Sequence, residues 1–172
     1  MSASINVTTV QSFPAKIAEV KKYVHLINKK VSEWNLTIVK KYLVSKNIYS
    51  AEDIDKVESE YKKFIVLCIS FPQLNFAMAR AIDEFWHCHV LFTEDYTKMC
   101  QSLGGTYLHH RPAILDTDED LSTCFVENTL SAYKDFFGEP DKKYWDVVVC
   151  VCANNCCTNI SKKSMYSELV LA

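Results

Sequence analysis

Four of the five histidines of this chain fall within 24 residues and form two tight pairs. The first pair is His87 and His89, and the second is His109 and His110. Asp83 precedes His87 by four residues, which is about one helical turn. Imidazole and carboxylate groups are ordinary protein ligands for zinc, iron and copper. The cluster therefore predicts a site for a divalent transition metal, with zinc as the first choice and iron or copper as alternatives.

The spacing of His87 and His89 places a condition on this site. Residues two apart on an unbroken helix point about 200° apart, so the two rings could not reach one ion. A break is expected near residues 90–93, with a new helix beginning at Thr93. If the preceding helix frays or tightens at His89, both rings can converge on one ion. A turn at residues 104–105 would then bring the second histidine pair back to the first.

Asp83 has two possible roles at such a site. It could be a ligand, or it could accept the proton of a ligating histidine and so fix its tautomer. Trp86 is expected to form a wall. The element Glu84-x-x-His87 has no second copy, which disfavours the di-iron site of helical bundles. A water on an open coordination position could become a hydrolytic nucleophile, but no substrate is identified, so the sequence assigns no reaction.

A second cluster of potential ligands consists of four thiols, Cys150, Cys152, Cys156 and Cys157. Thiolates could hold zinc or copper(I), or they could form a redox-active set. Their spacing differs from the two separated Cys-x-x-Cys knuckles of a zinc finger. This cluster is therefore a second metal candidate with a thiol redox or metal-transfer role, unless the four thiols are ordinary strand and loop residues.

A competing hypothesis is a non-catalytic protein–protein interaction module. The histidines and their aromatic neighbours would then belong to the core, and the first amphipathic helix would bind an unknown protein partner. The distance between the two histidine pairs separates these hypotheses, because rings that ligate one ion must converge.

The elements that must position these residues are helical. Only three glycines and four prolines interrupt the 172 residues, which is too few for a many-stranded sheet. Apolar residues recur at helical spacing in a first segment, and capping signals mark several others. Helices are expected over 17–31, 36–43, 50–71, 74–89, 93–103 and 117–137. The chain is therefore predicted to be all-α, a single-domain irregular helical bundle of about six helices.

The pattern changes after Pro140. The segment Tyr144–Cys152 is rich in β-branched residues and indicates a short strand or a buried helix turn. We therefore expect a helical domain over residues 1–143. A Cys-rich C-terminal segment over 144–172 would pack on this domain or trail from it.

Composition excludes several classes of function. The 19 Lys+Arg against 21 Asp+Glu give a net charge of −2, without the basic excess of a dedicated nucleic-acid module. No apolar run approaches the roughly 20 residues of a membrane span, and no export signal opens the chain. Eight cysteines without such a signal indicate reduced thiols or metal ligands. We expect a cytoplasmic protein without nucleic-acid or membrane partners, although export by a signal-independent route would look the same.

The first histidine pair lies in a recognisable motif. Its core is Asp-x-x-Trp-His-x-His, followed by Tyr96, Cys100, Gly104 and residues 109–112. This pattern resembles the helical N-terminal region of plant glycine-rich domain-containing proteins and of their short bacterial relatives, over about residues 55–157. The resemblance implies an all-helical module with Asp83, Trp86, His87 and His89 as its signature, and it implies no reaction. The chain differs from these proteins in having no Gly-rich tail.

Overall fold

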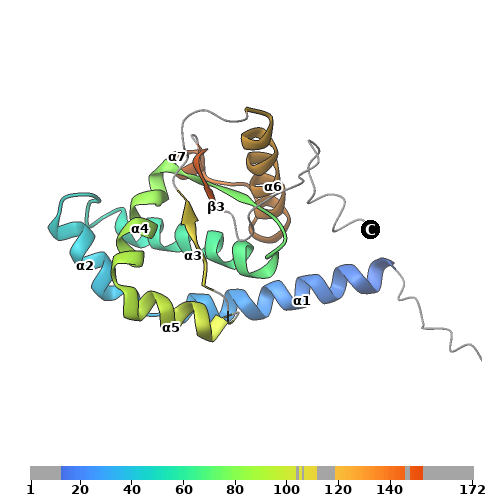
Figure 1. Cartoon of the computed structure of the whole chain (residues 1–172), viewed down its shortest axis with the longest axis horizontal. Coiled ribbons are helices and arrows are strands. Elements are labelled where there is room, and N and C mark those ends of the chain that lie inside the picture. The colour runs from blue at the N-terminus through green and yellow to red at the C-terminus, as the bar shows by residue number, and fades with distance from the viewer. Residues whose placement is uncertain (1–12, 104, 106, 112–118, 146–147, 153–172) are drawn as a thin grey trace, which may run out of the picture.

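The computed structural model of the protein describes residues 13–103, 105, 107–111, 119–145 and 148–152. Helices make up most of this part of the chain (Figure 1): α1 (Phe13–Ser32), α2 (Thr37–Ser45), α3 (Ile54–Ser70), α4 (Arg80–Leu91), α5 (Thr93–Leu103), α6 (Glu119–Phe137) and α7 (Lys142–Trp145). Three short strands, β1 (Phe76–Ala79), β2 (His110–Arg111) and β3 (Val148–Cys152), form a small sheet. The predicted all-α class is confirmed, with the sheet as a minor addition.

Helix α3 is the centre of the core. Helices α1, α4 and α6 all pack on it. Its side chains are buried around most of its circumference, with Tyr61, Phe64 and Leu67 fully enclosed. A helix that is apolar on several sides is typical of an interior position. Helix α4, which carries Asp83 and His87, therefore packs against the centre of the core.

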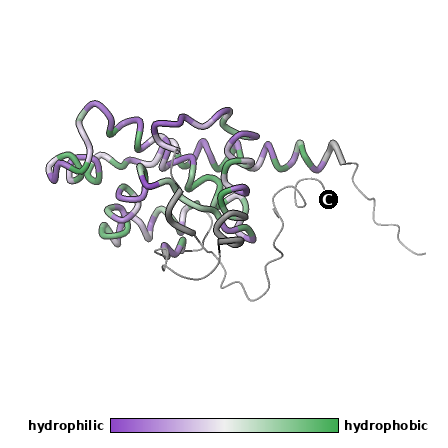
Figure 2. Tube along the Cα trace, turned by 90° about the horizontal axis from the view of Figure 1, so that it is seen from above, coloured by the Kyte–Doolittle hydropathy of each residue, from purple (hydrophilic) through white to green (hydrophobic). Residues whose placement is uncertain are grey.

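Helix α1 packs on the core through one narrow apolar face. Val24, Ile27 and Val31 are buried there, as the spacing of three and four residues predicts. Hydrophilic and hydrophobic residues alternate along the helix, and its N-terminal half extends away from the body (Figure 2). No helix in the described part of the chain has the length and apolar character needed to cross a membrane.

Two predicted helix boundaries are present in the structure. The backbone N–H of Asp53 donates to the Ser50 hydroxyl at 3.1 Å, and α3 begins at the next residue. Gly138 has a φ of 84° just after the end of α6, a conformation that glycine adopts without steric cost. The expected break before Thr93 is also present, because α4 ends at Leu91 and α5 begins at Thr93.

Helix α4 continues through His89 to Leu91, and its closing bond, from the Phe92 N–H to the His89 carbonyl at 3.0 Å, spans three residues. The expected helix over 74–89 is wrong at its start. Residues 76–79 were expected to lie in this helix, but they form strand β1, and all four are buried. A segment enclosed on both faces carries no period that separates helix from strand. Its partner is β3, much later in the chain, with Phe76 opposite Cys152.

The sheet has the order β1-β3-β2, and both pairings are antiparallel. The outer edge of β1 is covered by α6, where the Thr129 hydroxyl accepts from the Ala77 N–H at 2.8 Å and lies 3.1 Å from the Ala77 carbonyl. This contact satisfies an edge that would otherwise be open to other chains. On the other side of the sheet, β2 places His110 opposite Cys152.

Candidate metal centre

Helix α4 places the first two residues of the site on one face. Asp83 and His87 are four residues apart, so their side chains lie above one another. The distance from Asp83 Oδ2 to His87 Nδ1 is 3.6 Å. Glu84 belongs to the same region, with its Oε2 at 3.9 Å from the same His87 nitrogen. This part of the site needs only regular helix geometry.

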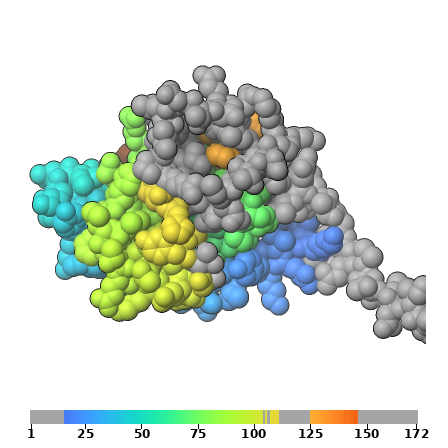
Figure 3. Space-filling view, viewed as in Figure 1, coloured from blue at the N-terminus to red at the C-terminus, as the bar shows by residue number. Residues whose placement is uncertain are grey.

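The third residue of the site, His110, lies in the segment that follows α5. The Trp86 indole N–H donates to the Tyr96 hydroxyl at 2.9 Å, and this hydroxyl donates to the Leu108 carbonyl at 2.7 Å. Trp86, Tyr96 and Leu108 are all buried. The segment 107–111 therefore lies against α4 and α5, where Figure 3 shows it as the yellow atoms beside the lime-green helices. This contact brings His110 to Asp83, with Nε2 at 3.1 Å from Oδ1.

Asp83, His87 and His110 together form a group that could hold a metal ion. One ligand atom from each lies within 4.8 Å of the other two. The side chains of His110 and Asp83 are 6% and 12% exposed, whereas that of His87 is 41% exposed. The group therefore has an enclosed half and a half that faces solvent.

The three aromatic rings at this position form a stack. The His110 ring lies between Trp86, with centroids 4.3 Å apart, and His87, with centroids 4.4 Å apart. The two imidazole planes differ by only 7°. The lone pair of an imidazole lies in the ring plane, so two parallel rings cannot both point at one ion. His87 must rotate before it can share an ion with His110, and its exposure at the surface leaves room for this.

The protonation of His110 follows from its neighbours. An ionised carboxylate only accepts hydrogen bonds, so Asp83 fixes the proton of neutral His110 on Nε2. The other nitrogen, Nδ1, is buried and has no hydrogen-bond partner among the described residues. Such atoms are uncommon in folded proteins. The position of this ring is therefore not explained by a complete set of hydrogen bonds.

His89 lies elsewhere, on the other side of α4. Its Nδ1 is 2.9 Å from the Tyr61 hydroxyl and its Nε2 is 2.9 Å from Asp95 Oδ2, which also accepts from the Trp34 indole. The ring is fully buried, and burial lowers its pKa although Asp95 acts in the opposite direction. Both nitrogens are engaged, so this ring is a structural link between α3, α4 and α5. The predicted convergence of His87 and His89 on one ion does not occur in this structure, because α4 continues through His89 to Leu91.

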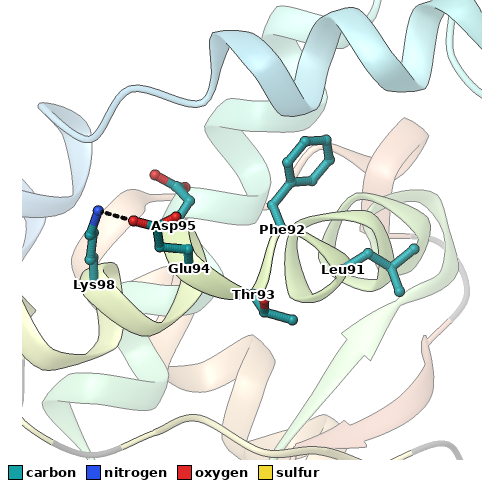
Figure 4. A pocket seen from close by; sticks show the side chains of 6 residues that line it. All are labelled: Leu91, Phe92, Thr93, Glu94, Asp95 and Lys98. Atoms are coloured by element: carbon teal, nitrogen blue, oxygen red, sulfur yellow. Dashed lines mark hydrogen bonds and ion pairs between the residues drawn. The ribbon is translucent and has the colours of Figure 1, made fainter.

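Asp95, a hydrogen-bond partner of His89, also lines a hollow at the surface. Figure 4 shows a shallow hollow at the junction of α4 and α5, lined by Leu91, Phe92, Thr93, Glu94, Asp95 and Lys98. Glu94 and Lys98 form an ion pair across it at 2.6 Å. The hollow contains none of the three residues of the Asp83 group, so it is a separate surface feature.

Among the side chains that the structure describes, His109 is a further predicted ligand that is not part of the group. His109 is exposed and its ring packs on Tyr107, with centroids 5.0 Å apart. Cys88, between the two histidines of α4, is buried, and burial raises its pKa to about 11. A thiol with such a pKa stays protonated and is a poor ligand. Of the thiol cluster, Cys150 and Cys152 lie in β3, whereas Cys156 and Cys157 lie outside the described residues.

Comparison with known proteins places the chain in a family. The model of the UCP032817-like family matches residues 16–125. The chain belongs to this family. No curated protein and no solved structure matches it. The part shared with the UCP032817-like family contains Asp83, His87 and His110, whereas the thiols of β3 lie beyond it. The resemblance to glycine-rich domain-containing proteins stays a prediction.

Proposed function

We propose that the protein binds one divalent transition metal ion through Asp83, His87 and His110. Two imidazoles and one carboxylate suit zinc, and the same donors also suit iron(II). Zinc remains the first choice. The observation that carries the proposal is the convergence of Asp83, His87 and His110, of which one ligand atom each lies within 4.8 Å of the other two. His89, in contrast, has a hydrogen-bond partner on each nitrogen and lies outside this group.

Binding requires two local changes. The ion would take the place of the proton between His110 Nε2 and Asp83, and the proton of the neutral ring would move to Nδ1, so that a neutral imidazole and an ionised carboxylate hold the ion. His87 then turns out of its parallel stack so that its Nδ1 lone pair points at the ion. Neither change disturbs the backbone of α4, because the Asp83 and His87 side chains already share a face.

Elemental mass spectrometry after equilibrium dialysis against zinc tests this proposal. We expect about one zinc per chain in the wild type and a loss of binding in the His87→Ala/His110→Ala double variant. His25→Ala is the matched control, because His25 is exposed on α1 and its removal should leave the stoichiometry unchanged. Circular dichroism of each variant verifies that the helices persist.

Two results contradict the proposal. Equal stoichiometry in the wild type and the double variant moves the ion to other residues, with the thiols of 150–157 as the next candidates. An absence of bound zinc, iron and copper in every variant favours the protein–protein interaction module instead.

A further inference from the structure

The Asp83–His87–His110 group has one open side. Exposure rises from the enclosed side chains of His110 and Asp83 to 41% at His87 and 58% at Glu84. Three protein ligands leave at least one coordination position of zinc unfilled. Because the enclosed half is filled by Trp86 and His110, the unfilled positions face the exposed half. An ion bound here is therefore accessible to a ligand from solution.

The exposed side is a stripe of helix α4. Arg80, Glu84 and His87 are spaced by four and three residues, so they lie along one face, and all three are accessible to solvent. Arg80 and Glu84 are separated by about 6 Å along the helix axis. Within the described part of the chain, Arg80 has no ion pair or hydrogen bond. Its guanidinium is therefore available to a ligand that reaches the metal.

The cationic residue at position 80 is an arginine, which is rare in this chain. The chain has 17 lysines and only two arginines. Guanidinium presents a planar fork of donors that matches a carboxylate or phosphate, which the ammonium group of lysine does not. One of the two arginines thus stands one turn before Asp83 on the stripe that borders the site.

The charges around the ion favour an anion. A divalent ion with one ligating carboxylate and two neutral imidazoles keeps one positive charge. Arg80 adds another and Glu84 removes one, so the open side stays positive overall. Glu84 is the only acid of this stripe in the described residues, and it should compete with an incoming anion.

We infer that the metal centre binds a small oxyanion, a carboxylate or a phosphate group, at the open position of the ion, with Arg80 as its second anchor and Glu84 as its competitor. The inference rests on the proposed metal site. It names the class of ligand that the site takes, and it involves no covalent step.

Cobalt(II) absorption spectroscopy tests this inference, because cobalt(II) replaces zinc and has visible bands that respond to its ligands. The protein is loaded with cobalt(II) and titrated with inorganic phosphate and, separately, with acetate, with the weakly coordinating anion perchlorate at equal ionic strength as the reference. We expect the bands to shift and saturate with phosphate or acetate but not with perchlorate. Cobalt is quantified after gel filtration, so that extraction of the ion is distinguished from binding to it.

Four variants make the assignment specific. Arg80→Gln should raise the half-saturating phosphate concentration about tenfold, and Arg80→Lys should recover only part of this loss. Glu84→Gln should lower the half-saturating concentration. Lys41→Gln removes the same charge from an exposed position on α2 and should change nothing.

The outcomes distinguish this inference from the metal site itself. If no visible bands develop with cobalt(II), the metal site fails and the oxyanion site fails with it. Bands that develop but ignore both anions leave the metal site intact and overturn the oxyanion site. An Arg80→Gln variant that behaves like Lys41→Gln overturns the role of Arg80.

Discussion

Trp86 and His110 stack face to face, with ring centroids 4.3 Å apart and ring planes 22° apart. The indole N–H also donates to the Tyr96 hydroxyl. One face and the N–H edge of the Trp86 ring therefore each have a defined neighbour. The stack places a fluorescent side chain in direct contact with a proposed metal ligand.

The Trp86–His110 stack predicts that a paramagnetic ion bound at the site quenches the fluorescence of Trp86. Copper(II) added to a Trp34→Phe/Trp145→Phe variant, which retains Trp86 alone, should abolish most of its emission with a one-to-one end point. The His87→Ala variant in the same background is the control and should need a much higher copper concentration. Strong quenching with the same midpoint in both proteins would show that copper binds near Trp86 without His87.

His89 is predicted to matter for stability. His89→Ala removes a fully buried ring together with its hydrogen bonds to Tyr61 and Asp95. We expect a loss of about 2–4 kcal/mol in the free energy of unfolding, measured by urea denaturation of the metal-free protein. His109→Ala, at an exposed position, should cost less than about 0.5 kcal/mol. A loss below about 1 kcal/mol for His89→Ala would contradict its structural role.

The contrast between these histidines explains how far the sequence could lead. The clustering of four histidines with Asp83 pointed to the region in which Asp83, His87 and His110 converge, and the spacing of four residues between Asp83 and His87 was enough to predict their shared face. The sequence could not rank His89 and His110. That ranking depends on Tyr61, Asp95 and the return of β2, which are contacts between separate elements.

The fold likewise contains elements that the sequence predicts and elements that it does not. Helix periodicity and the Ser50–Asp53 pair were readable locally. The hydrogen bond between these two residues is present, although α3 begins only at Ile54. Strand β1 was not readable, because a fully buried run has the same pattern in a helix and in a strand. Its pairing with β3 and its cover by Thr129 come from distant parts of the chain. The polar partner of a buried backbone group leaves no local signal.

Thr129 is predicted to hold α6 against the edge of β1. Thr129→Val keeps the shape of the side chain but leaves the Ala77 N–H without its acceptor at 2.8 Å. We expect a loss of about 1–3 kcal/mol in the free energy of unfolding and faster hydrogen exchange at Ala77. Thr129→Ser retains the hydroxyl and should keep most of the protection of this amide. Equal exchange rates in Thr129→Val and the wild type would exclude this hydrogen bond as the cause of edge protection.

Glu60 should make stability depend on pH in the acid range. This carboxylate is buried, and burial alone would raise its pKa. Hydrogen bonds from Tyr133 at 2.5 Å, Trp145 at 3.0 Å and Lys63 at 3.0 Å outweigh burial and lower the pKa below its ordinary value of 4.5. A lowered pKa in the folded state means that the folded protein binds the proton less readily than the unfolded chain. The contribution of Glu60 is therefore complete above about pH 4.5 and is lost as the pH falls through the folded-state pKa.

The variant Glu60→Gln tests this sign, because it keeps the shape of the side chain and cannot ionise. We expect it to be less stable than the wild type at pH 7 and to approach the wild type as the pH falls below 4.5. Urea denaturation at several pH values measures the difference. Glu127→Gln, at an exposed position on α6, removes one carboxylate from the surface and is the control; it should change the free energy of unfolding by less than about 0.5 kcal/mol. The difference in the free energy of unfolding between Glu60→Gln and the wild type could instead stay constant from neutral to acid pH. This result would mean that the charge of Glu60 does not stabilise the fold.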